Sequence, residues 1–348
     1  YEFPSLHFYK FCASMRVKKK KKGGTFVIEE VLTDSLGIAA AYRRLKPIMI
    51  HTPLAPSNIL GKEKEGAIFL KLENLQRTGS FKARGAYNKL ASLTDAEKLR
   101  GVIACSAGNH AQGVALAGSL LGINVRIFMP LTAAKTKIEA TRSYGAQVVL
   151  AGETFDETKQ LTVDAMKDSG EVFVSPFDDR AVMEGQGTIA IELLEDLPDV
   201  DNIIIPIGGG GLIAGMALAL KELRPEVKII GVQSYGVYGM IASIWQQKLV
   251  ANRRSRTIAD GCDVALAGEL TYDVLKTRID ETVLVEESDI EQAIHYLALK
   301  EKVIAEGAGA LSTAAILSGQ IDHLLRGKKT VALVSGGNID FSVFKEII

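Results

Sequence analysis

The sequence predicts an α/β protein built on parallel β-sheet. Short runs rich in β-branched residues alternate with amphipathic stretches of ten or more residues, and this alternation is typical of strand–helix–strand units. The predicted strands are 67–72, 102–105, 125–128, 147–150, 203–207, 227–232, 283–285 and 331–334. Repeated units of this kind place their strands parallel, so ligands are expected at the carboxyl ends of the strands.

The segments between the strands support this fold and suggest two domains. The stretches 111–121 and 134–144 have helical periodicity, and 101–176 reads as a compact strand–helix set of its own. We therefore expect a basic tail at 1–24, a large domain and a smaller inserted one. The expected domain boundaries are 25–95 with 178–348 for the large domain and 96–177 for the small domain.

Composition excludes several classes of protein. The chain of 348 residues is 47% hydrophobic and 24% charged, and no apolar run reaches the roughly 20 residues that span a bilayer. Three cysteines without metal-ligand spacing do not suggest a disulfide framework or a zinc site, which fits a reducing cytoplasm. The zero net charge divides into +6 at 1–24 and −6 elsewhere. We interpret the lysine block 18–22 as a solvated or expression-derived tail, in preference to a nucleic-acid or anionic-lipid arm.

A glycine run follows the predicted strand 203–207 and precedes an apolar helical stretch. The loop residues are Gly208, Gly209, Gly210, Gly211 and Leu212. Residues without a Cβ let successive N–H groups approach one phosphate, and the following helix N-terminus adds partial positive charge. The loop lacks the Lys-Ser/Thr of a P-loop, and Gln233 stands where a dinucleotide site needs an acid. We predict a phosphate site, with a tightly packed turn as the structural alternative.

Lys82 stands at the expected start of a helix, directly after Phe81. Most lysines are solvated surface charges. A lysine near a helix N-terminus and against apolar neighbours has its ammonium form disfavoured, however, so a neutral amine becomes available to form an imine. The local sequence therefore predicts a reactive amine at Lys82.

A second polar loop follows the strand 102–105, and a third follows the last strand. The second loop comprises Ser106, Ala107, Gly108, Asn109 and His110. Its N–H groups, together with the side chains of Ser106, Asn109 and Gln112, can bind a carboxylate. The alternative is a helix capped by Ser106, with His110 a satisfied polar residue. Ser335 brings a hydroxyl to the same sheet edge, where an ordinary turn is the alternative.

One ligand would use all of these loops. Pyridoxal 5′-phosphate (PLP) has an aldehyde for a lysine, a phosphate for glycines, a ring hydroxyl for an amide and a ring nitrogen for a hydroxyl. The chain also contains, in order, the segments TGSFKARGA, SAGNHAQG, GGGGLIAG, ADGCD, EGAGA and SGGNID. From about residue 30 to its end it resembles the serine/threonine dehydratases of PLP fold type II, and among them the catabolic threonine dehydratases.

The resemblance implies a tryptophan synthase β-like fold, with two parallel-sheet α/β domains and the cofactor in the cleft between them. It implies that Lys82 forms the imine, that Phe81 and Gly210 flank the ring, and that Asn109 binds its 3-hydroxyl. It further implies that the glycine loop holds the phosphate, that Ser335 faces the pyridine nitrogen, and that residues 106–110 bind the substrate carboxylate.

The implied reaction is β-elimination of L-threonine to 2-oxobutanoate and ammonia, with L-serine to pyruvate as a secondary activity. A neutral Ser335 makes the ring a weaker electron sink than an acid would, which favours elimination over transamination. The freed Lys82 amine would take the α-proton, and the PLP phosphate would protonate the leaving hydroxyl. Alternatives are a serine-specific dehydratase, another fold type II PLP enzyme, or a non-catalytic metabolite-binding protein of the same fold.

Departures from relatives refine these expectations. Ala107 stands where serine racemases of this family carry a catalytic serine, and 233–239 lacks the carboxylates that hold their divalent ion, so we expect neither racemisation nor a metal. The chain stops at Ile348, where biosynthetic relatives add an isoleucine sensor, so isoleucine feedback is not expected. The resemblance also implies a role in amino-acid catabolism or isoleucine biosynthesis, a cytoplasmic homodimer or homotetramer, and no nucleic-acid or membrane partner. An AMP-like nucleotide activator is a further implication, with Arg77, Thr78, Gln112 and Asn338 as candidate contacts.

Overall fold

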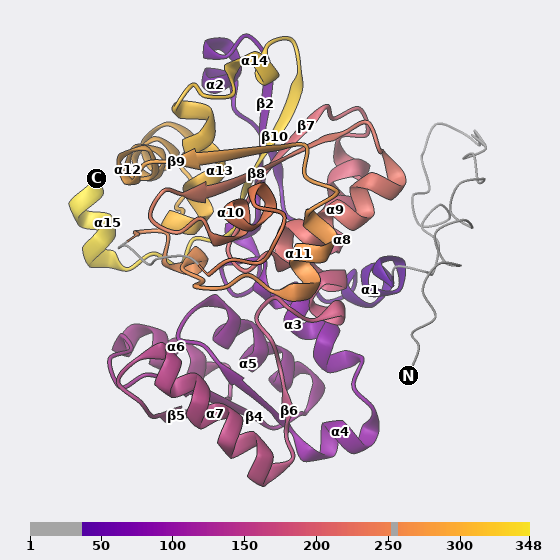
Figure 1. Cartoon of the computed structure of the whole chain (residues 1–348), viewed down its shortest axis with the longest axis vertical. Helices are drawn as coiled ribbons and strands as arrows, with labels where there is room; N and C mark the ends of the chain where they lie inside the picture. The colour runs from indigo at the N-terminus through magenta and orange to yellow at the C-terminus, as the bar shows by residue number, and fades with distance from the viewer. Residues whose placement is uncertain (1–36, 252–256) are drawn as a thin grey trace.

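The computed structural model describes residues 37–251 and 257–348, so the predicted basic tail at 1–24 lies outside the described residues. The chain forms two lobes, each built around its own β-sheet (Figure 1). The strands of the larger sheet are β1 (Leu54–Pro56), β2 (Ala67–Leu72), β7 (Asn202–Pro206), β8 (Lys228–Ser234), β9 (Glu281–Val285) and β10 (Lys329–Val334). Those of the smaller sheet are β3 (Val102–Cys105), β4 (Val125–Met129), β5 (Gln147–Leu150) and β6 (Val172–Phe173).

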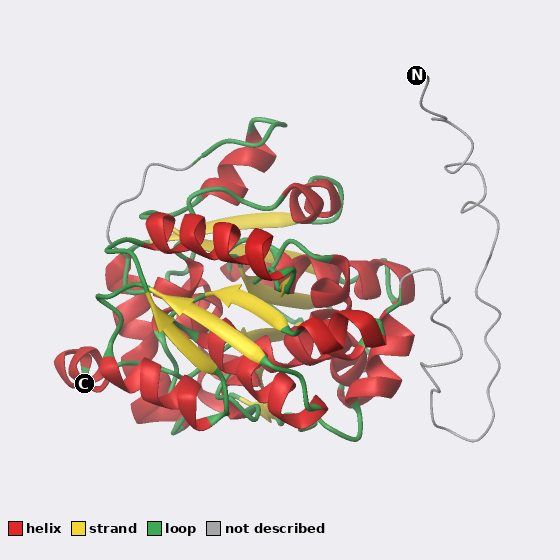
Figure 2. Ribbon diagram, turned by 90° about the horizontal axis from the view of Figure 1, so that it is seen from below, coloured by secondary structure: helices red, strands yellow, loops and turns green. Residues whose placement is uncertain are grey.

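Helices cover both sheets, and Figure 2, seen from below, shows strands lying between layers of helices. The helices before the smaller sheet's last strand are α1 (Ile38–Leu45), α2 (Asn58–Glu63), α3 (Lys82–Ala91), α4 (Asp95–Arg100), α5 (Asn109–Leu121), α6 (Lys135–Ser143) and α7 (Phe155–Ser169). The helices after it are α8 (Arg180–Asp196), α9 (Gly211–Leu223), α10 (Gly239–Trp245), α11 (Glu269–Leu275), α12 (Glu287–Tyr296), α13 (Gly307–Leu317), α14 (Asp322–Leu325) and α15 (Phe341–Ile347). Short 3₁₀ turns η3 (Glu73–Leu75) and η4 (Asp260–Cys262) and a π-helical turn η5 (Leu297–Glu301) complete the described elements.

Strand pairing confirms the parallel sheets with one exception. In the described residues the larger sheet has the order β1-β2-β10-β7-β8-β9 and the smaller sheet β5-β4-β3-β6. Every neighbouring pair is parallel except β1 with β2, which is antiparallel. The expectation of purely parallel pairing is therefore wrong at this edge. Strand β1 has only three residues and ends in Pro56, so it offered no alternating pattern, and a proline is tolerated at a sheet edge.

The eight predicted strands all exist, three with the predicted boundaries and five with ends shifted by one or two residues, whereas β1 and β6 were not predicted. Strand β6 is only two residues long, too short for any periodic signal. All strands of the smaller sheet fall inside 96–177, which supports our proposal that this range is the small domain. Helix α3 lies at the boundary of the two lobes and packs on α5 (Figure 1).

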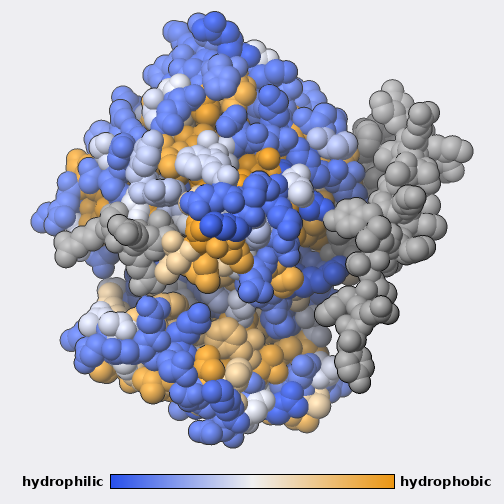
Figure 3. Space-filling model, in the orientation of Figure 1, coloured by the Kyte–Doolittle hydropathy of each residue, from blue (hydrophilic) through white to orange (hydrophobic). Residues whose placement is uncertain are grey.

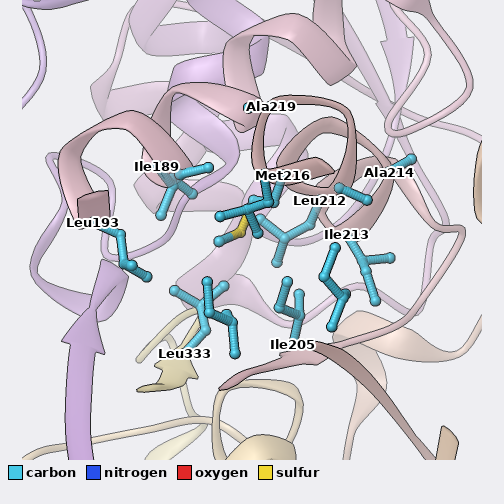
Figure 4. Close-up of a cluster of buried hydrophobic side chains, with 14 of the residues drawn as sticks. Ile189, Leu193, Ile205, Leu212, Ile213, Ala214, Met216, Ala219 and Leu333 are labelled. Carbon is cyan, nitrogen blue, oxygen red and sulfur yellow. The ribbon is translucent and has the colours of Figure 1, made fainter. Parts of the chain in front are cut away.

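The central strands are buried on both faces, which explains their unbroken apolar runs. Ile203 and Ile205 of β7 join a core with α8 and α9, whereas Ile204 joins a second core with α12 and α13. Successive side chains of a strand point to opposite faces, so one strand contributes to both cores. Figure 4 shows the first core, in which Ile205 and Leu333 of the sheet lie beneath Leu212, Ile213 and Met216 of α9. Strand β7 and helix α9, which flank the glycine loop, therefore pack in the same core.

A buried ionic cluster joins η3, α3 and α8. The Arg84 guanidinium donates to both oxygens of Glu73 at 2.8 Å and to both oxygens of Glu192 at 2.6 and 2.9 Å. Lys71 Nζ lies 3.3 Å from Glu192 and donates to the Thr52 carbonyl at 2.7 Å. Burial alone would lower the pKa of Arg84, but the two carboxylates raise it above its usual value. Bidentate pairing on both sides fixes helix α3 against the large lobe.

On the face shown in Figure 3, most of the described surface is hydrophilic, and hydrophobic residues gather where the two lobes meet. Within the described ranges, no helix combines the length and the apolar character needed to cross a bilayer.

Candidate active site

The start of helix α3 is held to the carboxyl end of the central strand β10. Ser80 forms an isolated β-bridge with Gly336, and the Phe81 N–H donates to the Ser335 carbonyl at 3.1 Å. These backbone contacts bring Lys82, the first residue of α3, to the sheet edge that the sequence predicts for the ligand. The lysine loop and the last loop therefore meet as expected from parallel topology.

The Lys82 side chain is half-buried, and its amine lies beside a backbone carbonyl and an aromatic ring. Its Nζ donates to the Pro176 carbonyl at 2.7 Å and lies 5.2 Å from the centroid of the Phe81 ring. Burial lowers the pKa of Lys82 from its ordinary value of 10.5 to about 8, partly offset by Cys262 and Glu306. Because desolvation disfavours the ammonium form, a large share of this amine is neutral near pH 8.

This lowered pKa predicts aldehyde reactivity at unusually low pH. Only the neutral amine attacks an aldehyde, so the initial rate of Lys82 modification should rise with pH and reach half its maximum near pH 8, not near 10.5. Reductive methylation with formaldehyde over pH 6–11, followed by peptide mass spectrometry, measures this rate for cofactor-free protein. A half-maximum above pH 10 would show that the amine is solvated like an ordinary surface lysine.

The glycine loop joins strand β7 to helix α9. Gly210 has a φ of +97° and is the N-cap of α9, and within the described residues no side chain caps this helix. The first N–H groups of α9 are thus free of a capping side chain and suited to an anion, because a helix N-terminus carries partial positive charge. This geometry supports the predicted phosphate site.

Packing supplies a second reason for the glycines. A Cβ on Gly209 would lie 2.3 Å from the Phe177 ring, and one on Gly211 would lie 2.8 Å from the Phe177 Cα. A Cβ on Gly208 would lie 3.2 Å from the Cα of Cys262. The tightly packed turn, considered above as an alternative, is therefore also present at these positions.

The segment 175–178 links the lysine to the glycine loop. Pro176 accepts the Lys82 hydrogen bond, and the Phe177 ring covers Gly209. The Asp178 carboxylate accepts from the Glu269 and Thr271 N–H groups at 3.2 Å each, at the start of α11. The Thr271 hydroxyl in turn donates to the Gly209 carbonyl at 2.7 Å. These contacts hold the glycine loop from its outer side.

The loop 106–110 belongs to the small lobe and opens helix α5. Gly108, not Ser106, occupies the N-cap, and no described side chain caps the helix. The alternative of a helix capped by Ser106 is therefore wrong, since the Ser106 hydroxyl accepts only from the Gly108 N–H, at 3.2 Å. Residues 106–109 are partly exposed, and Ala107 presents a methyl group only. The uncapped N–H groups of α5 are suited to a carboxylate.

His110 is buried, and its side chain forms a hydrogen bond within the small lobe. Its Nε2 lies 2.9 Å from the Val174 carbonyl, and burial, with a contribution from Lys82, lowers its pKa to about 3. The imidazole is therefore neutral at physiological pH, and a carboxylate can use only the backbone N–H of this residue.

Asn109 connects the small lobe to the end of strand β10. Its Nδ2 donates to Glu306 Oε1 at 2.6 Å, and its Oδ1 accepts from Asn338 Nδ2 at 2.7 Å. Asn338 also donates to the Thr78 carbonyl at 2.7 Å. Ser335 lies at the same edge, is 3% exposed, and donates to the Ala308 carbonyl at 3.3 Å.

The candidate effector residues do not form one cluster of direct bonds. Thr78 and Gln112 are buried, whereas Arg77 is exposed and donates from Nε to the Ile48 carbonyl.

The segment 233–239, considered above for a divalent ion, begins with Gln233. The Gln233 side chain forms hydrogen bonds with the backbone of Ile207 and Ile241. Across the described ranges, no group of three or more His, Cys, Asp or Glu side chains is arranged to hold a metal ion.

Several residues at this site received no role from the sequence, among them Phe177, Thr271 and Glu306. Glu306 lies in the segment EGAGA, which carried the resemblance without pointing to a function for its acid. Phe177 and Thr271 belong to no motif noted in the sequence. Both contact Gly209 from segments that are distant from it along the chain.

Comparison with known proteins decides the family. The family model described as pyridoxal-phosphate dependent enzyme matches residues 45–336. The chain belongs to this family. It is 52% identical over 327 residues to catabolic L-threonine dehydratase of Staphylococcus aureus (strain USA300), covering 93% of this chain and 94% of that protein. It is 50% identical over 310 residues to catabolic L-threonine dehydratase of Escherichia coli (strain K12), covering 89% of this chain and 94% of that protein.

A solved structure agrees with the family. The processed form of threonine deaminase isoform 2 from Solanum lycopersicum matches with a TM-score of 0.87 at 38% identity, over 91% of this chain and 93% of that one. The PLP fold type II predicted from the sequence is thereby confirmed, and PLP is the cofactor of the family.

The residues present fit this cofactor. A phosphate needs clustered N–H donors, and α9 begins with an uncapped first turn after four glycines. An aldehyde needs a neutral amine, and the pKa of Lys82 is lowered to about 8. A pyridine nitrogen needs a hydrogen-bond partner, and the buried Ser335 hydroxyl lies at the same sheet edge.

Proposed function

We propose that the protein is a threonine ammonia-lyase, which converts L-threonine to 2-oxobutanoate and ammonia and acts on L-serine as a secondary substrate to give pyruvate. The observation that carries this proposal is the position of Lys82. Its amine has a lowered pKa and lies at the same sheet edge as the glycine loop. Helix α3, which begins at Lys82, packs against helix α5 of the small lobe. The two bacterial relatives named above as catabolic L-threonine dehydratases match nearly the whole chain, which supports the same substrate.

Each loop has a proposed task. The N–H groups of Gly208, Gly209, Gly210, Gly211 and Leu212 bind the phosphate. Lys82 would bind the aldehyde carbon, Phe81 and Gly210 would flank the ring, and Asn109 would donate to the ring oxygen. Ser335 would orient the ring nitrogen, and the N–H groups of 106–110 would bind the substrate carboxylate through the positive end of α5. When bound, PLP supplies an electron sink for negative charge at the substrate α-carbon.

Proton transfer is assigned to Lys82. The Lys82 amine would accept the α-proton of the substrate, and a pKa near 8 places this base close to physiological pH. Ala107 has no proton to give to the opposite face of the α-carbon, so racemisation is disfavoured. Ser335 is neutral and leaves the ring nitrogen without a counter-charge, which favours elimination over transamination.

The activity is tested with purified protein, PLP and either L-threonine or L-serine. We expect oxo-acid absorbance to increase with both amino acids and faster with L-threonine, and D-threonine serves as the control. Faster turnover of L-serine would favour the serine-specific alternative. If PLP binds and neither amino acid yields an oxo acid, the protein is not a dehydratase, and the metabolite-binding alternative gains support.

Finer properties are proposed on resemblance alone. These are a cytoplasmic homodimer or homotetramer, activation by an AMP-like nucleotide, and a place in amino-acid catabolism or isoleucine biosynthesis. For the activator, Thr78 and Asn338 are joined by a hydrogen bond and Asn338 reaches Asn109, so a ligand near them would lie beside the catalytic loops. Arg77 and Gln112 remain candidate contacts of the same kind.

A further inference from the structure

A buried carboxylate that the proposed mechanism does not use lies beside the small-lobe loop. Glu306 is the N-cap residue of helix α13 and is 5% exposed. Its N–H donates to the Gly336 carbonyl at 3.1 Å, which ties it to the end of strand β10. Its Oε1 accepts from Asn109 Nδ2 at 2.6 Å, across the boundary between the lobes. The large lobe thus reaches the residue assigned to the cofactor ring oxygen.

Glu306 and Asn338 select one orientation of the Asn109 amide. Asn338 supplies a donor to Asn109 Oδ1, and Glu306 supplies an acceptor to Asn109 Nδ2. If the Asn109 amide were rotated by 180°, its Nδ2 would face the Asn338 donor and its Oδ1 would face the Glu306 acceptor. An amide nitrogen has two N–H groups, so one stays available after the Glu306 bond forms. The arrangement therefore presents a donor, which is what a ring oxygen requires.

The surrounding backbone fixes the position of the carboxylate. A Cβ on Gly336 would lie 2.2 Å from Glu306 Oε1, and one on Gly261 would lie 3.9 Å from it. The strand end is thus in direct contact with the acid, and a side chain at Gly336 would displace it. Such close packing restricts the rotamers of Glu306 and so the direction of its bond to Asn109.

Four charged or titratable groups, on three elements, face Glu306. They are Asp260 and Cys262 of η4, Lys137 of α6 and Lys82 of α3. Lys137 pairs with Asp260 at 2.8 Å, so a second contact between the lobes lies beside the first. Burial, with help from Asp260, raises the pKa of Glu306 to about 7, against the effects of Asn109, Lys137 and Lys82. The carboxyl therefore changes charge in the physiological range.

We propose that Glu306 is a positioning residue, which orients Asn109 toward the cofactor ring oxygen and joins the small-lobe loop to the large lobe. This inference rests on the proposed function for the role of Asn109. Deprotonation of Glu306 strengthens its bond to Asn109, because a charged acceptor binds an N–H more strongly than a neutral one. The environment of the ring oxygen therefore changes with pH through Asn109.

Two variants of the full-length PLP-loaded protein test this role. Glu306→Leu removes the acceptor, and we expect the Kd for PLP to rise about tenfold and the cofactor absorption band to shift. Glu306→Gln keeps an acceptor oxygen without a charge, so we expect a Kd near that of the wild type. The wild-type absorption spectrum should show an inflection near pH 7, which Glu306→Gln abolishes. Equilibrium dialysis and a spectral titration from pH 6 to 8.5 supply both readouts.

Glu301 provides the matched control, since it accepts a hydrogen bond from Ser57 and lies outside the site. Glu301→Gln should retain the wild-type inflection and Kd. An unchanged Kd and spectrum in Glu306→Leu would overturn the proposal. If that variant does not fold, an inflection near pH 7 that persists in Glu306→Gln would overturn it equally. Neither readout uses turnover, so a wild-type protein that binds PLP without deaminating threonine would contradict the proposed function alone.

Discussion

Replacing Lys82 with alanine is expected to abolish both the absorption band of the covalently bound cofactor and the turnover of threonine. The methyl side chain cannot form a covalent bond to the cofactor aldehyde, and it cannot accept the α-proton. General-base catalysis alone contributes about 10²- to 10⁴-fold, and covalent binding is lost as well, so we expect the rate to fall by at least about 10⁴-fold. Ultraviolet–visible spectra and oxo-acid assays of the purified variant measure both effects.

A control separates chemistry from folding. Lys98→Ala removes a surface lysine of α4 whose ion-pair partner Asp95 is fully exposed, and it should leave the spectrum and the rate unchanged. The glycine loop of the Lys82→Ala protein is intact, so PLP should still bind, though more weakly and reversibly. A visible band that survives dialysis of Lys82→Ala would place the covalent link on another lysine and contradict the site described above.

The sequence was sufficient to predict which edge of the sheet holds the site. It was not sufficient to predict all of the residues that contact one another at that edge. The β-branched runs, the glycine run and Lys82 are local signals, because strand burial, phosphate approach and a helix start each depend on neighbouring residues. All four predicted loops lie at or near the carboxyl ends of strands, and the lysine loop pairs directly with the loop after β10. Parallel topology converts these local signals into one site, so the fold class and the site could be predicted together.

Other features depended on contacts between distant segments. Glu306 precedes a helix, where an acid ordinarily only stabilises the N-terminus. Its bond to Asn109 spans 197 positions of the chain and crosses the lobe boundary. Phe177 occupies the space beside Gly209 and Gly211, where a Cβ would clash with it. The sequence indicated the phosphate as a reason for these glycines, but not their packing against Phe177. In the sequence, Arg84 of the segment KARGA resembles an ordinary surface residue. Only the folded structure shows that η3 and α8 surround it.

Replacing Arg84 with methionine is expected to give the largest loss of stability. Arg84 and Glu73 are both 0% exposed, and Glu192 is 4% exposed. Methionine is similar in length but carries no charge, so two carboxylates would stay buried without their main cation. Removing one partner of a buried ion pair typically costs about 3–5 kcal/mol, because the remaining charge is desolvated and unpaired. Urea unfolding followed by circular dichroism measures the free energy of unfolding.

Two further variants show whether the charges cause this loss. Arg326→Met removes an arginine whose ion pair with Glu65 is largely exposed, and its unfolding midpoint should match the wild type. In the combined variant Arg84→Met, Glu73→Gln and Glu192→Gln no carboxylate faces the methionine, so part of the lost stability should return. The cluster also fixes α3, so Arg84→Met should weaken PLP binding through Lys82 even under conditions in which the protein stays folded. A fully stable Arg84→Met protein would contradict this account, because Glu73 and Glu192 would then not need the Arg84 cation.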